Sequence, residues 1–338
     1  MNRKIALVLI LLCAAGSNSF AQTNSTPGAP TAAIAAAANQ FLATLDEAQR
    51  GKLVFDFKDD AQRKRWSNLP SAIFKRQGLR IGDLTQPQRE AALAVLAAAL
   101  SPQGYQKILQ IVRADELLKR SSGEAMFGDE QYFISLLGQP STTEPWMIQF
   151  GGHHLGLNIT LVGQQRTLAP SHTGAQPAIY ELEGKTVRPL GRESDKAFAL
   201  LSSLSESQRK QAILGFQMRD LVLGPGRDGQ TIQPEGVKGS ALTEKQREML
   251  LDLASEWTGI LHESVAKVKM DEMKNNITET YFAWSGPTEK GSAAYFRIQG
   301  PTVIIEYAPQ RLGGEPTKHI HTIYRDPTND YGTKWWKR

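Results

Sequence analysis

The chain has 338 residues, enough to bury a large core and to form two domains or one duplicated domain. With 41% hydrophobic and 22% charged residues it has the composition of an ordinary globular protein, which excludes a wholly disordered chain. A formal charge of only +5, without a run of lysine or arginine, argues against nucleic acid as a partner.

The first 21 residues have the pattern of a signal peptide. Arg3 and Lys4 precede an apolar stretch over 5–15 that is too short to span a membrane, and Ser19-Phe20-Ala21 fits the small-x-small cleavage rule. Cleavage after Ala21 predicts a periplasmic or secreted chain without a membrane span, and the loss of Arg3 and Lys4 lowers its charge from +5 to +3. The one cysteine, Cys13, is lost too, so a disulfide-free mature chain is expected. A lipoprotein leader is the weaker alternative, because Leu12 precedes the cysteine.

Four capping boxes organise the helical parts of the chain. Residues 22–31 predict a disordered linker, and the alanine-rich residues 32–45 predict a helix. Beyond them, Asp, Ser or Thr is followed three places later by Gln, so that each side chain bonds the other's backbone amide. The boxes begin at Asp46, Thr85, Ser205 and Thr243. Apolar spacing predicts helices over 86–100 and 104–118, and one long helix or two over 244–273.

Strands are predicted after each pair of boxes. Alternation with β-branched and aromatic residues indicates strands over 131–137, 146–150, 154–162, 279–284, 292–299, 302–307 and 319–324. Turn residues recur between them, as in Gly138-Gln139-Pro140 and Gly286-Pro287. We therefore expect an α+β fold with an internal duplication, residues 32–195 and 196–338, each a helical pair followed by an antiparallel β-meander, with the second repeat packed on the first. A long glycine-rich loop is expected over 222–241.

Histidines are few and gather in two stretches. Five of the six lie in or just after Phe150–Ile159 and Lys318–Asp326: His153, His154, His172, His319 and His321. The first stretch places two adjacent histidines among glycines, which indicates either close approach of a ligand or a bulge. We expect the fold to bring both stretches together at one polar site between the two repeats.

The second stretch has the spacing of metal ligands. His319 and His321 are two residues apart on a predicted strand, so their side chains should point the same way, roughly 7 Å apart. Aligning the repeats sets Asn158 against Glu306 and brings His172 opposite the His319/His321 pair. His319, His321 and Glu306, with His172 as a further candidate ligand, suit one zinc, iron or copper ion.

The catalytic candidates are His153, His154, Arg325 and Asp330. His153 or His154 can add a ligand or act as acid or base, but on a strand only one of the two would face the site. Arg325 and Asp330 follow the second stretch directly. They form either a structured turn with Arg325 paired to Asp326 or Asp330, or a site in which Arg325 holds an anionic substrate and Asp330 orients a histidine.

The two histidine stretches resemble those of a secreted family known as domain of unknown function 3500. The resemblance rests on Gln149–Leu155 and on His319–Gly332, and it covers roughly residues 35–335. It implies an exported protein and adds no reaction or catalytic residue.

Two functions from different classes remain open. The first is a metal-dependent enzyme, hydrolytic or oxidative, that acts on a small-molecule substrate. The second is a non-catalytic envelope protein that binds a ligand or a metal. No nucleophile motif, phosphate-binding loop or His-Glu-x-x-His occurs, so serine hydrolase, nucleotide enzyme and zincin chemistry are not expected. A structural domain whose histidines only form hydrogen bonds is the remaining interpretation.

Overall fold

The structure, a computed structural model, describes residues 29–312 and 314–337. The predicted signal peptide and most of the predicted linker lie outside these residues. The first half of the chain comprises α1 (Ala29–Ala43), α2 (Glu47–Leu53), β1 (Val54–Phe55), α3 (Asp60–Arg63), β2 (Leu79–Arg80), α4 (Gln86–Ala99), α5 (Pro102–Ser122), β3 (Phe133–Leu137), β4 (Trp146–Gly152), β5 (Leu155–Val162), β6 (Gln165–Thr167) and β7 (Ser171–Ala175). Residues 29–31, expected in the linker, belong to α1.

The second half follows a small hairpin of β8 (Tyr180–Leu182) and β9 (Lys185–Val187). It comprises α6 (Gly191–Ser203), α7 (Glu206–Ala212), β10 (Val237–Lys238), α8 (Glu244–Thr258), α9 (Glu263–Asn275), β11 (Tyr281–Ser285), β12 (Tyr295–Gly300), β13 (Val303–Pro309), β14 (Ile320–Arg325) and α10 (Thr333–Trp336). Short 3-10 turns, η1 (Ile81–Asp83), η2 (Asp129–Gln131), η3 (Gly239–Ala241), η4 (Ile277–Glu279), η5 (Pro316–Lys318) and η6 (Asp330–Gly332), lie between them. The span 244–273 is thus two helices.

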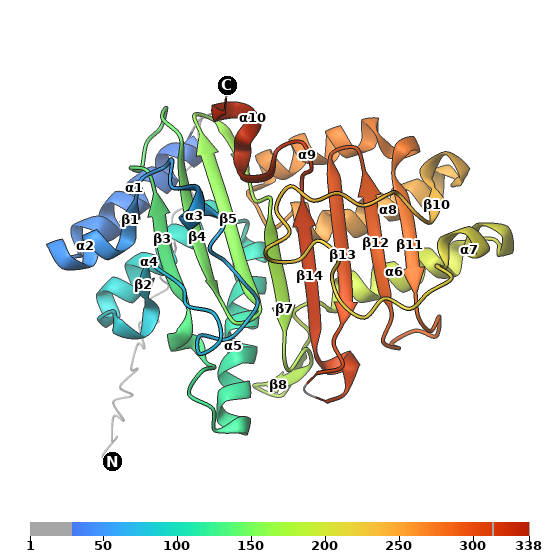
Figure 1. Cartoon of the computed structure of the whole chain (residues 1–338), viewed down its shortest axis with the longest axis horizontal. Helices are drawn as coiled ribbons and strands as arrows, with labels where there is room; N and C mark the ends of the chain where they lie inside the picture. Colours follow the sequence, from blue (N-terminus) through green and yellow to red (C-terminus); the bar gives the residue numbers. More distant parts are fainter. Residues whose placement is uncertain (1–28, 313, 338) are drawn as a thin grey trace, which may run out of the picture.

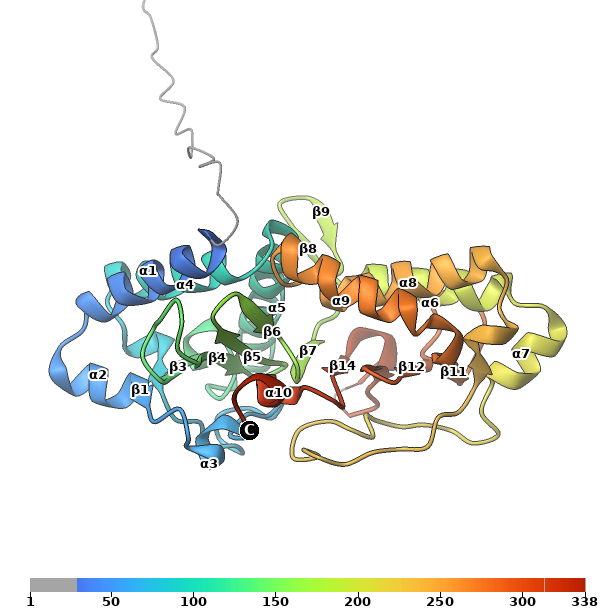
Figure 2. The same ribbon diagram turned by 90° about the horizontal axis from the view of Figure 1, so that it is seen from above.

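One twelve-stranded sheet runs through both halves, which confirms the α+β class. Its order is β1-β3-β4-β5-β7-β14-β13-β12-β11-β10, with β2 on β3 and β6 on β5. Neighbours are antiparallel except β1 and β3. The two halves meet where β7 pairs with β14, at the centre of the sheet (Figure 1). Seen from above, helices cover one face and mainly loops cover the other (Figure 2).

All four predicted capping boxes are present and start α2, α4, α7 and α8. Within each half the two boxes also bond to each other, since Gln49 contacts Gln88 and Gln208 contacts Gln246 at 2.9 Å. The capping glutamines therefore fix both the helix starts and the way the helices pack in pairs.

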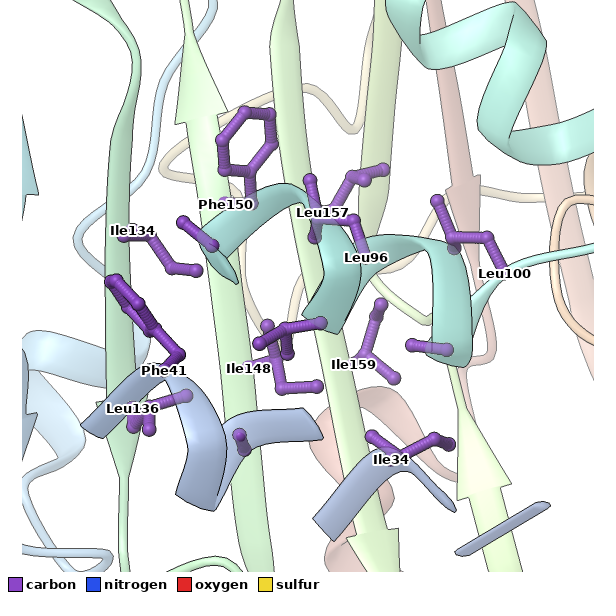
Figure 3. Close-up of a cluster of buried hydrophobic side chains, with 14 of the residues drawn as sticks. Ile34, Phe41, Leu96, Leu100, Ile134, Leu136, Ile148, Phe150, Leu157 and Ile159 are labelled. Atoms are coloured by element: carbon purple, nitrogen blue, oxygen red, sulfur yellow. The ribbon is translucent and has the colours of Figure 1, made fainter. Parts of the chain in front are cut away.

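The helix-covered face of the sheet is apolar. Alternate residues of β3, β4 and β5 point to this face and pack against α1 and α4, as Ile148 and Ile159 do against Ile34 and Leu96 (Figure 3). A second cluster, built around Trp257, Trp284 and Phe296, fills the same layer in the second half. These two clusters supply the apolar burial that stabilises the sheet.

The loop-covered face is polar although it is buried. In the first half Gln149 and Asn158 lie opposite each other in the sheet and bond at 3.0 Å, while Gln62 reaches Gln149 at 3.0 Å from the covering segment 56–78. In the second half the same strand positions hold Arg297 and Glu306. The first part of the loop expected over 222–241 covers these two residues. The end of that span is not a loop but forms β10 and η3. The sheet thus carries buried polar side chains on both sides of its centre.

Candidate metal centre

The first histidine pair sits in a tight turn and not on a strand. β4 ends at Gly152 and β5 begins at Leu155, and His154 has the left-handed φ of 63°. The rings of His153 and His154 lie against each other, tilted by 35°, with centroids 3.6 Å apart. Strand alternation therefore does not decide which ring faces the site: His153 bonds Asp115, whereas His154 faces His319.

The second pair lies at the start of β14, beside the seam between the halves. His321 is opposite Gly174 of β7, and His172 is opposite Ile323. A Cβ atom on residue 174 would lie 2.7 Å from the Ile320 carbonyl oxygen and 3.2 Å from both the His154 and His172 rings. Glycine at this position therefore leaves room for the His154 and His172 rings beside β14.

Three Nε2 atoms converge from the two stretches. His154 Nε2 is 2.8 Å from His319 Nε2, which is 3.1 Å from His321 Nε2. The ligand atoms of these residues lie within 4.8 Å of one another, and those of Asp115, His153 and His154 form a second such group. The structure therefore brings both stretches together, and these buried groups can hold a metal ion.

Neighbouring polar groups orient two of the rings. His319 Nδ1 donates to the Leu312 carbonyl at 2.6 Å, so in the neutral ring the lone pair is on Nε2. The Asn68 amide lies 3.3 Å from His321 Nδ1, and Asp220 lies 3.5 Å from the same atom. His154 Nδ1 has no hydrogen-bond partner among the described residues. The lone pair of His319 Nε2 thus faces the Nε2 atoms of both other rings. Hydrogen bonds alone satisfy three converging nitrogens poorly.

Burial keeps the histidine cluster, which comprises His154, His172, His319 and His321, uncharged. His154 and His172 are at most 1% exposed, and burial, reinforced by the other histidines, holds the pKa of each well below its usual range. Burial also lowers the pKa of His319 to about 4, and it lowers the pKa of His321 although Asp220 opposes the shift. At neutral pH these rings are therefore in the form that binds metal ions.

Asp115 is a functional candidate that the sequence reasoning missed. It lies on α5, is 1% exposed, and accepts a 2.6 Å hydrogen bond from His153 Nδ1. A second bond, 3.0 Å from Gly128 N, holds the carboxylate in place. The sequence carried one signal for it. Ile108 and Ile111 precede it by seven and four residues on the predicted helix, so an apolar residue would be expected where this aspartate stands. Asn68 and Asp220, both in loops, gave no such signal.

His172 and Glu306 are placed differently from the other predicted ligands. Neither nitrogen of His172 has a hydrogen-bond partner among the described residues, and its ring centroid is 5.3 Å from that of His321. The Glu306 oxygens accept from the backbone N–H groups of 222 and 223, each at 2.8 Å, and from Tyr295 at 2.7 Å. Neither His172 nor Glu306 belongs to the groups of close ligand atoms found among the described residues.

Arg325 and Asp330 lie together, toward the far end of β14 from His319. Arg325 Nη1 donates to Asp330 at 2.8 Å and to Asp228 at 3.1 Å, and its other nitrogens bond the carbonyls of 223 and 224. Burial raises the pKa of Asp330 to about 6, although Arg325 opposes the shift. These contacts match the structured-turn interpretation, and none of them joins Asp330 to a histidine.

Among the described residues no helix is long and apolar enough to cross a membrane.

Comparison with known proteins places the chain in a family. No curated protein and no solved structure matches the chain. The model of one family, described as a protein of unknown function (DUF3500), matches residues 27–333, which includes both histidine stretches. The chain therefore belongs to the DUF3500 family.

Proposed function

We propose that this is an exported protein that binds one transition-metal ion, zinc, iron or copper, through His154, His319 and His321. The convergence of the three Nε2 atoms carries this proposal. At a Zn–N distance of roughly 2.0–2.1 Å, two tetrahedral ligands lie about 3.3 Å apart, close to the 2.8 and 3.1 Å between the nitrogens here. Small outward movements of the rings would admit an ion in place of the shared proton.

The supporting contacts are those that histidine ligands usually have. A ligand ring commonly donates its other N–H to a carbonyl or carboxylate, which fixes the ring and the tautomer. His319 does so to Leu312, and Asp220 stands 3.5 Å from His321 Nδ1. The two halves of the chain contribute ligands jointly, His154 from the first and His319 with His321 from the second.

The use we favour for this ion is catalysis on a small-molecule substrate. Three protein ligands leave one tetrahedral position for water or substrate, as in catalytic zinc sites. The Asp115–His153 pair lies directly beside His154, where it can move a proton to or from a group bound at that position. A hydrolytic reaction with zinc, or an oxidative one with iron or copper, fits this arrangement.

A non-catalytic metal-binding protein is the second candidate. The observation that favours it is burial, because none of the five histidines is more than 7% exposed. A closed site of this kind would store or sense an ion with little access for a substrate.

Metal content of the untagged mature chain, purified from the periplasm, tests the binding step. We expect about one equivalent of a transition metal in the wild type and in His262→Ala, whose ring lies outside the cluster. We expect none in the His319→Ala/His321→Ala variant. A folded wild-type protein without metal after incubation with zinc, iron and copper would contradict the proposal, and absence of the chain from the periplasm would contradict export.

The cobalt(II)-substituted protein separates the two candidates. An open coordination position predicts that azide shifts the visible absorption spectrum. An unchanged spectrum at saturating azide would favour the closed, non-catalytic site.

We also propose that the two halves, residues 32–195 and 196–338, are an internal duplication. In support, each half contains two capping boxes and two matching 3-10 turns, η1 and η2 in the first half and η3 and η4 in the second. The second half also repeats the strand order of the first, with β11, β12, β13 and β14 in the places of β3, β4, β5 and β7. Superposition of the two halves in a crystal structure tests this. A match of fewer than four strands would contradict it.

A further inference from the structure

A second candidate site lies at the other end of the central strands. A pocket of about 890 Å³ is lined by residues that follow β5, that end β14, and that belong to α8, α9 and α10. The histidine cluster lies before β5 and at the start of β14 instead. On β14 the pocket residue Tyr324 is three residues from His321, about 10 Å at roughly 3.3 Å per residue, and the odd spacing points the two side chains to opposite faces of the sheet. The pocket is therefore not part of the proposed metal centre.

The pocket has the size and the apolar walls of a small-molecule site. Its volume is within the range of roughly 300–1,000 Å³ typical of ligand pockets. Leu168, Trp257, Leu261, Val265 and Tyr324 give it an apolar lining. A ligand that fits it therefore has an apolar or aromatic body.

Arg166 supplies an unpaired charge to this lining. It is only 7% exposed, yet its Nε and Nη1 atoms have no hydrogen-bond partner among the described residues. The other buried arginines of the described chain each bond carbonyl or carboxylate oxygens: Arg63, Arg76, Arg297 and Arg325. A buried guanidinium without an acceptor is costly, and burial accordingly lowers the pKa of Arg166.

The remaining charges of the pocket do not supply that acceptor. Lys269 bonds Asp326 at 2.6 Å and Glu272 at 2.9 Å, so both carboxylates are already paired. Lys334 is exposed and adds a second positive charge to the lining. Three cations against two carboxylates leave the lining with a net positive charge.

We propose that this pocket binds a small amphipathic organic anion, a carboxylate or sulfonate on an apolar body, with its anionic group on Arg166. The guanidinium matches such a group with two parallel N–H···O bonds, and the apolar walls take the body. Binding here is independent of the histidine cluster.

Two matched fluorescent probes test the charge requirement. 8-Anilinonaphthalene-1-sulfonate carries an anionic group, and N-phenyl-1-naphthylamine has the same aromatic body without it. In a fluorescence titration of the mature chain we expect saturable binding of one equivalent of the sulfonate, at least tenfold tighter than of the neutral probe. Equal affinities for the two probes would overturn the proposal.

Variants assign the binding to the pocket. Arg166→Gln should weaken the sulfonate by tenfold or more and leave the neutral probe unchanged. Arg192→Gln, on the surface of α6, is the control and should change neither. Val265→Trp, which narrows the pocket without touching a charge, should weaken both probes and covers the case in which Arg166→Gln does not fold. Sulfonate binding that survives both pocket variants would overturn the proposal, as would its loss in the folded His319→Ala/His321→Ala protein.

Discussion

The buried polar groups on the loop-covered face differ sharply between the flanks of the sheet and its centre. On the flanks, Gln149, Asn158, Arg297 and Glu306 each have at least one hydrogen-bond partner within the chain. At the centre, His172 has none, and His154 keeps Nδ1 without one among the described residues. Buried polar groups are nearly always bonded, so unbonded ones call for an explanation.

This difference separates structure from candidate function. The flanking groups attach the covering loops to the sheet, and their loss should cost stability. At the centre, the Nε2 atoms of His154, His319 and His321 face one another instead of a protein acceptor, an arrangement that the proposed metal ion would satisfy better than shared protons. Each prediction below tests one side of that contrast.

The largest loss of stability is expected for Glu306→Ala. The substitution leaves the N–H groups of 222 and 223 and the Tyr295 hydroxyl without their acceptor, and it removes a negative charge opposite Arg297. We expect urea unfolding to show a loss of about 3–5 kcal/mol, typical of breaking a buried charged network. Glu306→Gln should not rescue it, because its NH₂ group would face a donor.

The exposed Glu206 on α7 is the matched control for this substitution. Glu206→Ala should change stability by no more than about 0.5 kcal/mol. A loss at Glu306 as small as this would show that the flanking network does not hold the loop, and the contrast with the centre would then fail.

A smaller, pH-dependent loss is expected at the centre in the metal-free protein. The pKa of His319 is about 4 in the folded chain and returns to about 6.5 on unfolding. The unfolded chain therefore binds more protons between these values, so stability rises with pH across this window and is lost as pH falls from 6.5 to 4. The contribution of this one group is on the order of 3 kcal/mol.

Urea unfolding with a chelator present, at several values between pH 4 and 7, measures this dependence. His319→Gln should reduce the slope of the curve, to which His154, His172 and His321 also contribute. His262→Gln, outside the cluster, is the control and should leave the slope unchanged. Parallel curves for the wild type and His319→Gln would contradict the assignment.

Most of the fold was predictable because local signals specify it. The four capping boxes and the strands β3–β5 and β11–β14 were found within a few residues, since capping and alternation depend on near neighbours. The strands β1, β2 and β6 to β10 were not predicted. The stretch that forms β7 was expected to be a loop, and the other six strands are short. Two or three residues carry no usable period, and tertiary pairing with β3, β5 and β11 decides β1, β2, β6 and β10.

The site was predictable only in part, for the same reason. The two histidine stretches stand out in the sequence, and their meeting was expected. The turn at 153–154 was not foreseen, because the run from 154 to 162 alternates like a strand. Glu306 was grouped with the histidines through the alignment of the two repeats, whereas the covering loop provides backbone N–H groups that bind it. Asp115 is 38 residues from His153, and only the packing of α5 reveals the pair.

The smallest effect on stability is expected for His172→Leu, and its sign is the informative part. Leucine fills a similar volume and removes two buried nitrogens that have no partner, so stability should stay unchanged or rise by about 1 kcal/mol. The same change at a bonded position, Asn158→Leu, should instead cost about 1–3 kcal/mol, because Gln149 and the carbonyl of 170 lose their partner. Urea unfolding of both variants, with metal analysis of each, measures the contrast. If His172→Leu lost its metal as well as stability, His172 would be a ligand, and the ion would be held by more of the cluster than the three Nε2 atoms that converge here.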